Sequence, residues 1–326
     1  PPGPFPKDSR SDGPLSHIMT AETAVPTPAR NGLLPRLRLA PWLYLAPTLA
    51  VLFVWIYLPL FQAVQLSFTQ WNMLPTATPR PVGWENYRNL LALPELRQAA
   101  WNTLWYVLGL LPLSVLVPLA VAILTQDLGG PLRNLYRALI FIPMIVPPIV
   151  AAVLWRWLLN EDYGLVNRII TAFGADPVSF FQNTDIALWT MVWITGWKLM
   201  GFATLLLSAA NGTIDPGYVE AARMDGATRW QIVRDIRLPL LSPTILLLTM
   251  MTILFGAQWS FVYINAITDG GPLGSTTNVF FLMWKYGFQT FSAGWSATAG
   301  VMTFVVFGLI ALALLTLSRK LAFHDN

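Results

Sequence analysis

The stretch N-G-T-I-D-P-G-Y-V-E-A-A-R-M-D-G-A-T-R-W-Q-I-V-R-D-I-R-L-P-L-L-S-P runs from Asn211 to Pro243, and its setting decides the fold class. An apolar run covers residues 186–210 before it, and a second covers residues 240–267. Each run is near the ~20 apolar residues that a helix needs to cross the hydrocarbon core of a bilayer. The stretch itself is polar, so the sequence predicts two membrane-spanning helices joined by a structured segment outside the bilayer.

Turn and capping residues divide this polar segment into two short helices. Asp215 can cap the first helix, and Pro216 follows at the first helical position, where its missing N–H costs nothing. Asp225 and Gly226 break the chain, and Thr228 can cap a second helix through Ile236, which Leu238 and Pro239 are expected to end. Four arginines and four acidic residues cancel in charge, whereas anionic lipid selects strongly basic segments. The segment therefore suits a protein partner, with an amphipathic hairpin lying on the membrane as the alternative.

The composition extends this prediction to the whole chain. Of 326 residues, 11% are charged and 55% are hydrophobic, whereas soluble domains carry about 25% charged residues. Backbone groups in lipid must be hydrogen-bonded within their own segment, so long apolar runs predict helices, and prolines inside them predict kinks. The six predicted spans are Leu43–Leu66, Thr103–Leu124, Ala138–Leu159, Ile186–Ala210, Leu240–Ile267 and Trp295–Ser318, with kinks at Pro59, Pro112, Pro118, Pro143, Pro147 and Pro148.

Lys and Arg residues predict the orientation, because loops that stay in the cytoplasm carry an excess of them. They are denser before the first span and after the second, fourth and sixth spans than in the other loops. Both termini are therefore expected in the cytoplasm. Residues 1–41 are expected to form a disordered tail, with residues 1–18 resembling a vector-derived leader. Residues 42–323 form the expected membrane domain, and residues 324–326 a short C-terminal tail.

Missing residue types exclude several kinds of chemistry. The chain has no cysteine, and its two histidines, His17 and His324, lie in the expected tails. Disulfides, thiolate metal sites, cysteine nucleophiles and a histidine metal cluster are therefore excluded. No Gly-Lys dipeptide occurs, so a Walker A phosphate loop is impossible. The sequence predicts no catalytic residue, metal site or cofactor in this chain, and its basic residues form no patch for nucleic acid.

The polar segment resembles the "EAA" signature of ABC importer permeases. The residues that carry the resemblance are Glu220, Ala221 and Ala222, then Asp225, Gly226 and Ala227, and then Ile236, Leu238, Pro239 and Pro243. The resemblance implies that residues 211–243 form coupling helices that dock on a separate ATPase subunit. ATP and Mg²⁺ would then belong to that partner, and the chain would not itself be an enzyme.

Other segments resemble the carbohydrate-uptake branch of this family, which includes the maltose and glycerol-3-phosphate importers. These segments are Gly83–Leu90, Leu154–Gly164 and Thr268–Thr277, and the resemblance covers roughly Trp42 to Phe323. It implies an all-α type I ABC importer permease in the bacterial cytoplasmic (inner) membrane. It also implies a homologous second permease subunit, an ATPase homodimer and an extracytoplasmic solute-binding protein. The expected activity is the inward movement of a sugar or sugar-like solute by alternating access.

The candidate solute residues lie on the fourth and fifth spans. Lys198 stands at the centre of the fourth span, where an ionisable residue is by default functional. A lysine that only supports packing or hydration of a polar cavity is the alternative. Resemblance to the maltose-importer pattern adds Leu199 and Phe202. The fifth span offers aromatic, amide and hydroxyl groups that match a sugar ring, although membrane aromatics are also ordinary packing residues: Gln258, Trp259, Ser260 and Tyr263.

One close alternative to a sugar permease remains open, and two more distant ones lack the residues that they would require. A permease for a phosphorylated solute, such as glycerol 3-phosphate or a glycerophosphodiester, suits Lys198 equally well. A secondary transporter would require paired carboxylates or internal repeats in the membrane, and a membrane enzyme would require a titratable cluster. The predicted spans contain only Lys198 and Arg156 as charged residues. We expect Arg156 to reach the outer loop beside it rather than to gate the outer mouth.

Overall fold

The computed structural model describes residues 3, 39–74, 76–126 and 130–321. The tails predicted over residues 1–41 and 324–326 lie almost entirely outside these residues. The chain divides into two compact units, Pro1–Val51 and Leu52–Asn326. In the first unit the described structure is the helix α1, whose residues 42–51 all have exposed side chains.

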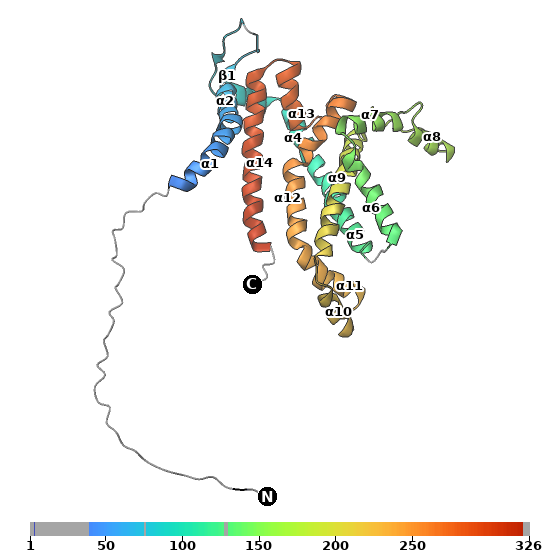
Figure 1. Ribbon diagram of the computed structural model, residues 1–326. Helices are drawn as coiled ribbons and strands as arrows, with labels where there is room; N and C mark the ends of the chain where they lie inside the picture. The colour runs from blue at the N-terminus through green and yellow to red at the C-terminus, as the bar shows by residue number, and fades with distance from the viewer. Residues whose placement is uncertain (1–2, 4–38, 75, 127–129, 322–326) are drawn as a thin grey trace, which may run out of the picture. The chain divides into compact units, whose positions relative to one another are not determined.

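The described residues are helical almost throughout, and Figure 1 labels the elements along the chain. One antiparallel pair of two-residue strands joins Thr69 to Pro81 and Gln70 to Arg80. The elements are α1 (Leu39–Leu52), η1 (Phe53–Tyr57), α2 (Leu58–Ser67), β1 (Thr69–Gln70), β2 (Arg80–Pro81), α3 (Glu85–Ala92), α4 (Pro94–Leu111), η2 (Pro112–Leu116), α5 (Val117–Leu124), α6 (Gly130–Ile145), α7 (Pro148–Leu158), α8 (Leu165–Ala172), α9 (Ala187–Gly212), α10 (Pro216–Met224), α11 (Arg229–Gln231), η3 (Ile232–Arg237), α12 (Leu238–Tyr263), η4 (Ile264–Thr268), α13 (Val279–Trp284), η5 (Lys285–Gln289) and α14 (Ala293–Leu321), where η denotes a π-helical segment.

Five of the six predicted spans are confirmed as continuous helices, and the third has a different form. Among the described residues, five helices are long and apolar enough to cross a membrane: Trp42–Ser67, Pro94–Leu124, Ala187–Gly212, Arg229–Thr268 and Ala293–Ser318. The third predicted span is instead a broken pair, Ala138–Ile145 and Pro148–Leu158, bent by 107°. Pro147 and Pro148 explain the break, because proline removes a backbone donor and restricts the residue before it.

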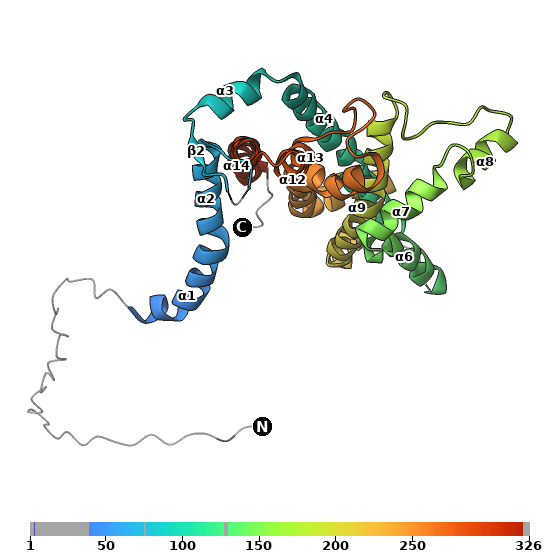
Figure 2. The same cartoon turned by 90° about the horizontal axis from the view of Figure 1, so that it is seen from above.

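Helix α9 is at the centre of the second unit, as the two views in Figures 1 and 2 show. It packs against α4, α5, α6 and α12. Gly201 permits a close approach to α6, because a Cβ at this position would overlap the carbonyl oxygen of Ile140. The largest core cluster joins Tyr106 of α4, Met191 of α9 and Phe281 of α13. Helix α9 is therefore the element that positions its neighbours.

Buried polar side chains hold the segment between η4 and α13 in place through hydrogen bonds. Asn102 of α4 donates through Nδ2 to the carbonyls of Gly274 at 3.0 Å and Thr277 at 2.8 Å. Asn278 caps α13 and donates to the carbonyl of Ala257 at 2.7 Å. Because these bonds join α4, α12 and α13, the segment is fixed at this end of the unit.

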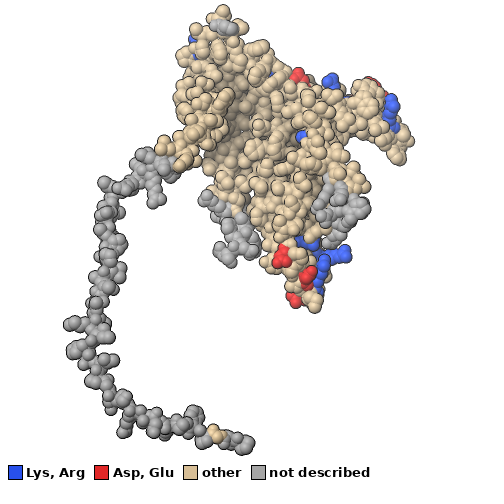
Figure 3. Space-filling view, in the orientation of Figure 1, with Lys and Arg blue, Asp and Glu red and all other residues tan. Residues whose placement is uncertain are grey.

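Charged side chains are unevenly distributed over the surface. Figure 3 shows blue and red atoms gathered over α10 and α11 at one end of the second unit and near the loops at the other end. The surface between these ends is almost free of charged side chains in this view. Such an apolar band is what a helical domain requires for contact with lipid.

Candidate functional site

The polar segment folds as two helices joined by a turn, a helical hairpin, as predicted, but the second helix does not end at Leu238 and Pro239. It continues through η3 into α12 as one helical run, Arg229–Thr268, because the π-helical turn η3 accommodates Pro239 at the start of α12.

The Asp215 carboxylate accepts a hydrogen bond from the Gly217 backbone N–H at 2.8 Å, and Pro216 begins α10. Thr228 forms a capping box with Gln231, in which each side chain accepts from the other residue's backbone N–H. Both predicted caps are confirmed, because each depends on residues that are neighbours in the sequence.

The turn between the two helices depends on Gly226. Its φ is +80°, a left-handed conformation that costs other residues free energy. This conformation lets the Ala227 N–H donate to the carbonyl of Ala222 at 2.9 Å, which closes the C-terminal end of α10. A Cβ at Gly226 would meet no atom within 4 Å, so only the backbone conformation requires glycine here.

The hairpin has an inner apolar side and an exposed side. Val219 and Ile232 are buried. Tyr218, Met224 and Trp230 are 55%, 88% and 67% exposed, and exposed charged residues lie beside them. The predicted coupling residues on this outer side are Glu220, Ala221, Asp225 and Gly226, whereas Ala222, Ala227, Leu238 and Pro239 are half-buried. The exposed side therefore has the mixed apolar and charged character of a protein-binding surface.

Arg237, one of the four arginines of the polar segment, is buried, which its sequence context did not predict. Arg237 is 6% exposed and lines a cavity of about 170 Å³ with Arg223, Arg229 and the end of α5. Its position in the last turn before α12 gave no signal of burial, because arginine is rarely buried.

Lys198 lies on α9 and faces the break between α6 and α7. Its ammonium group donates to the carbonyls of Pro143 at 3.3 Å and Met144 at 3.2 Å, and also to the carbonyl of Val146. The side chain is half-buried. In this conformation the ammonium binds backbone carbonyls, a contact that the sequence did not reveal because these residues are more than 50 positions away.

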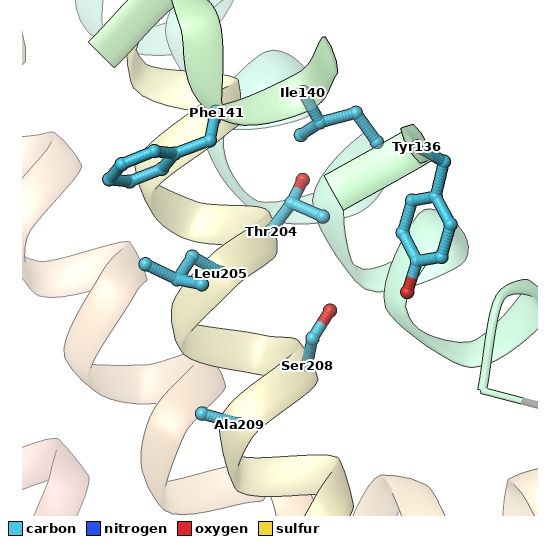
Figure 4. A pocket seen from close by; sticks show the side chains of 8 residues that line it. Tyr136, Ile140, Phe141, Thr204, Leu205, Ser208 and Ala209 are labelled. Atoms are coloured by element: carbon cyan, nitrogen blue, oxygen red, sulfur yellow. The ribbon is translucent and has the colours of Figure 1, made fainter. Parts of the chain in front are cut away.

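A cavity of about 170 Å³ lies on the same side of α9, between α6 and α9. The hydroxyl groups of Thr204 and Ser208 project from α9 toward Tyr136 and Ile140 of α6 (Figure 4). Thr204 is buried, and its Oγ1 has no partner among the described residues. The cavity thus offers a small number of polar groups in an apolar wall, which is the usual character of a small-ligand site.

The structure separates the predicted solute residues into those with some exposed surface and those that are fully buried. Leu199 and Phe202 are half-buried and pack against core clusters. On α12, Gln258 is exposed, and Trp259 is half-buried and stacked on Phe255 at 5.9 Å.

The other predicted residues of α12 point inward. Ser260 is fully buried, donates to Ala257 and accepts from Asn278 Nδ2 at 3.0 Å. Tyr263 is buried in the main core. Gln258 and Trp259 therefore keep exposed side-chain surface, while Ser260 and Tyr263 are enclosed by their own chain. Arg156 is exposed in the last turn of α7, beside the loop that follows this helix.

Comparison with known proteins agrees with this architecture. The chain is 31% identical to the trehalose/maltose transport system permease protein MalF of Thermococcus litoralis, over 81% of this chain and 88% of that protein. It is 29% identical to the sn-glycerol-3-phosphate transport system permease protein UgpA of Escherichia coli, over 82% and 90% of the two chains.

Its fold is similar to that in a crystal structure of a bacterial alginate ABC transporter in complex with an alginate pentasaccharide-bound periplasmic protein. The TM-score is 0.75 at 23% identity, and the match covers 87% of this chain and 95% of that chain. The family model described as "Binding-protein-dependent transport system inner membrane component" matches residues 114–322. With its spans, its helical hairpin and these matches, the chain belongs to the inner-membrane permease components of binding-protein-dependent ABC transport systems.

Proposed function

We propose that this chain is the permease subunit of an ABC importer that moves a sugar or sugar-like solute into the cytoplasm by alternating access. A separate ATPase homodimer, with its own ATP and Mg²⁺, supplies the energy by docking on the hairpin of α10 and α11. The observation that carries this proposal is the exposed side of the hairpin, where Tyr218, Met224 and Trp230 accompany Glu220.

One continuous helix can carry movement from the hairpin into the membrane. The helical run Arg229–Thr268 has 40 residues, which corresponds to about 60 Å, whereas the hydrocarbon core is ~30 Å thick. It begins in the hairpin and contains Gln258 and Trp259 far along its length. Because α12 packs against α9, a tilt of this helix by the ATPase would change the environment of both predicted solute helices.

The assembly has two further partners in this proposal. A homologous second permease covers the exposed apolar surface of the spans and completes the solute path. An extracytoplasmic solute-binding protein delivers the solute, which agrees with the periplasmic protein in the alginate transporter complex. Both termini lie in the cytoplasm, as the Lys and Arg distribution predicts.

The solute class is proposed from the relatives and from the accessible side chains. One relative is named for trehalose and maltose, and Trp259 with Gln258 suits a sugar through ring stacking and hydroxyl bonding. The second candidate is a phosphorylated solute, because another relative is named for sn-glycerol 3-phosphate. The pairing of this chain with an ATPase does not depend on which solute is correct.

Uptake by a reconstituted complex tests the proposal. The chain is combined with its second permease, ATPase and binding protein in proteoliposomes that contain ATP, and radiolabelled trehalose, maltose and sn-glycerol 3-phosphate are compared. We expect uptake of a sugar that requires ATP, and no uptake when this chain alone is present. Uptake of the phosphate ester alone would favour the second candidate, and ATP-dependent uptake by the single chain would refute the subunit assignment.

A further inference from the structure

The break between α6 and α7 removes the normal partners of two backbone carbonyls. In an α-helix, the carbonyl of each residue accepts from the N–H four residues later. Pro147 and Pro148 stand four residues after Pro143 and Met144, and proline has no N–H. Helix α6 ends at Ile145, and the two helix axes diverge by 107°. These carbonyls therefore need donors from another part of the chain.

Lys198 supplies the missing donors. Its Nζ atom donates to the carbonyls of Pro143 at 3.3 Å and Met144 at 3.2 Å, and to that of Val146 in the break itself. An ammonium group has three N–H donors and no acceptor, so three carbonyls use its full bonding capacity. The C-terminal end of α6 also carries the negative end of the helix dipole, which stabilises a nearby cation.

The neighbouring glycine explains how Lys198 reaches this position. Gly201 is three residues further along α9, hence on the same face of the helix. Its missing side chain lets α6 approach until a Cβ would overlap the Ile140 carbonyl oxygen. Because the backbones are close at Gly201, the lysine one turn away reaches the end of α6. The two residues act together to join α9 to the broken span.

We infer that Lys198 is a positioning residue that caps α6 and holds the α6–α7 break against α9, rather than a charge that binds an anionic solute. The consequence for substrate class rests on the proposed function. Lys198 and Arg156 are the only charged residues in the six predicted spans, and Arg156 is exposed at the end of α7. The middle of the membrane domain then offers no uncommitted cation from this chain, which favours an uncharged sugar over a phosphate ester in this half of the solute path.

Amide hydrogen exchange on the assembled complex, without any solute, tests the cap. In Lys198→Met we expect peptides covering residues 140–152 to exchange about 3- to 10-fold faster, as the loss of a hydrogen-bonded cap predicts. Lys198→Gln keeps two N–H donors without the charge and should be intermediate. Arg156→Met is the matched control, since it removes a charge from the same broken span, and it should leave these peptides unchanged. Unchanged protection in Lys198→Met would overturn the inference.

Transport measurements separate the cap from a solute contact. With maltose and sn-glycerol 3-phosphate as probes, Lys198→Met should lower the maximal uptake rate and leave the half-saturating concentration unaltered. A tenfold or larger rise in the half-saturating concentration for sn-glycerol 3-phosphate, with unchanged exchange, would overturn the cap and make Lys198 a solute ligand. If the wild-type complex takes up no sugar, the proposed function fails, while the exchange experiment still tests the cap.

Discussion

Substitution of Gly226 separates the backbone requirement of the coupling turn from its contact with a partner. The φ of +80° at this position costs a non-glycine residue about 1–2 kcal/mol, and less for asparagine. Among the described residues no atom lies within 4 Å of a Cβ at Gly226, and the position is exposed, so a larger side chain is expected to extend into solvent and to add little to this cost in the isolated permease. Gly226→Ala and Gly226→Trp should therefore destabilise the hairpin equally. In each variant the population of the open form of the hairpin should rise by a factor of about 5–30.

The assay compares amide exchange of residues 216–237 with ATP-dependent uptake. Both variants should increase exchange to the same extent, and Gly226→Asn should increase it less. If the ATPase docks here, Gly226→Trp should abolish uptake while Gly226→Ala reduces it. Gly212→Ala is the control, because Gly212 also has open space around it but no positive φ. Equal uptake by the Ala and Trp variants would refute docking at this turn, and normal exchange in both would refute the conformational argument.

Four other predictions concern the hairpin and the helices of the membrane domain. Glu220→Ala should leave insertion and thermal stability unchanged, because Glu220 is exposed, but should lower uptake and the ATPase activity of the complex; unaltered uptake would contradict the assignment. Gly201→Ala should lower the free energy of unfolding by about 1–3 kcal/mol, because the added Cβ overlaps α6. Gly308 of α14 has open space around it, so Gly308→Ala should be neutral or slightly stabilising. Asn278→Ala should destabilise the complex by about 1–3 kcal/mol by leaving buried groups unpaired. Ser260→Ala should alter the stability of the complex without changing the concentration dependence of sugar uptake. A changed concentration dependence would indicate that Ser260 contacts the solute.

Local features of this protein were predictable from its sequence. The spans follow from the lengths of apolar runs, and the hairpin follows from Asp215, Gly226 and Thr228. Each of these signals acts between residues a few positions apart: the Asp215 cap joins residues separated by two positions, and the Thr228 cap residues separated by three. The two helices of the predicted coupling segment and the turn between them therefore formed as expected, whereas the predicted helix end at Leu238 and Pro239 did not form. The docking function of the segment remains a prediction.

The tertiary structure alone decided which polar residues within the membrane are already bonded. Lys198 reaches carbonyls 52 to 55 residues away, and Ser260 accepts from a side chain 18 residues away. Hydropathy identifies such residues as costly in lipid, but it does not reveal which element supplies their hydrogen-bond partners, because those partners depend on how the helices pack. The same limit hid the burial of Arg237 and the extent of the bend at Pro147 and Pro148. Sequence set the helices and their caps, and packing determined which polar groups within the membrane domain are hydrogen-bonded and which are exposed.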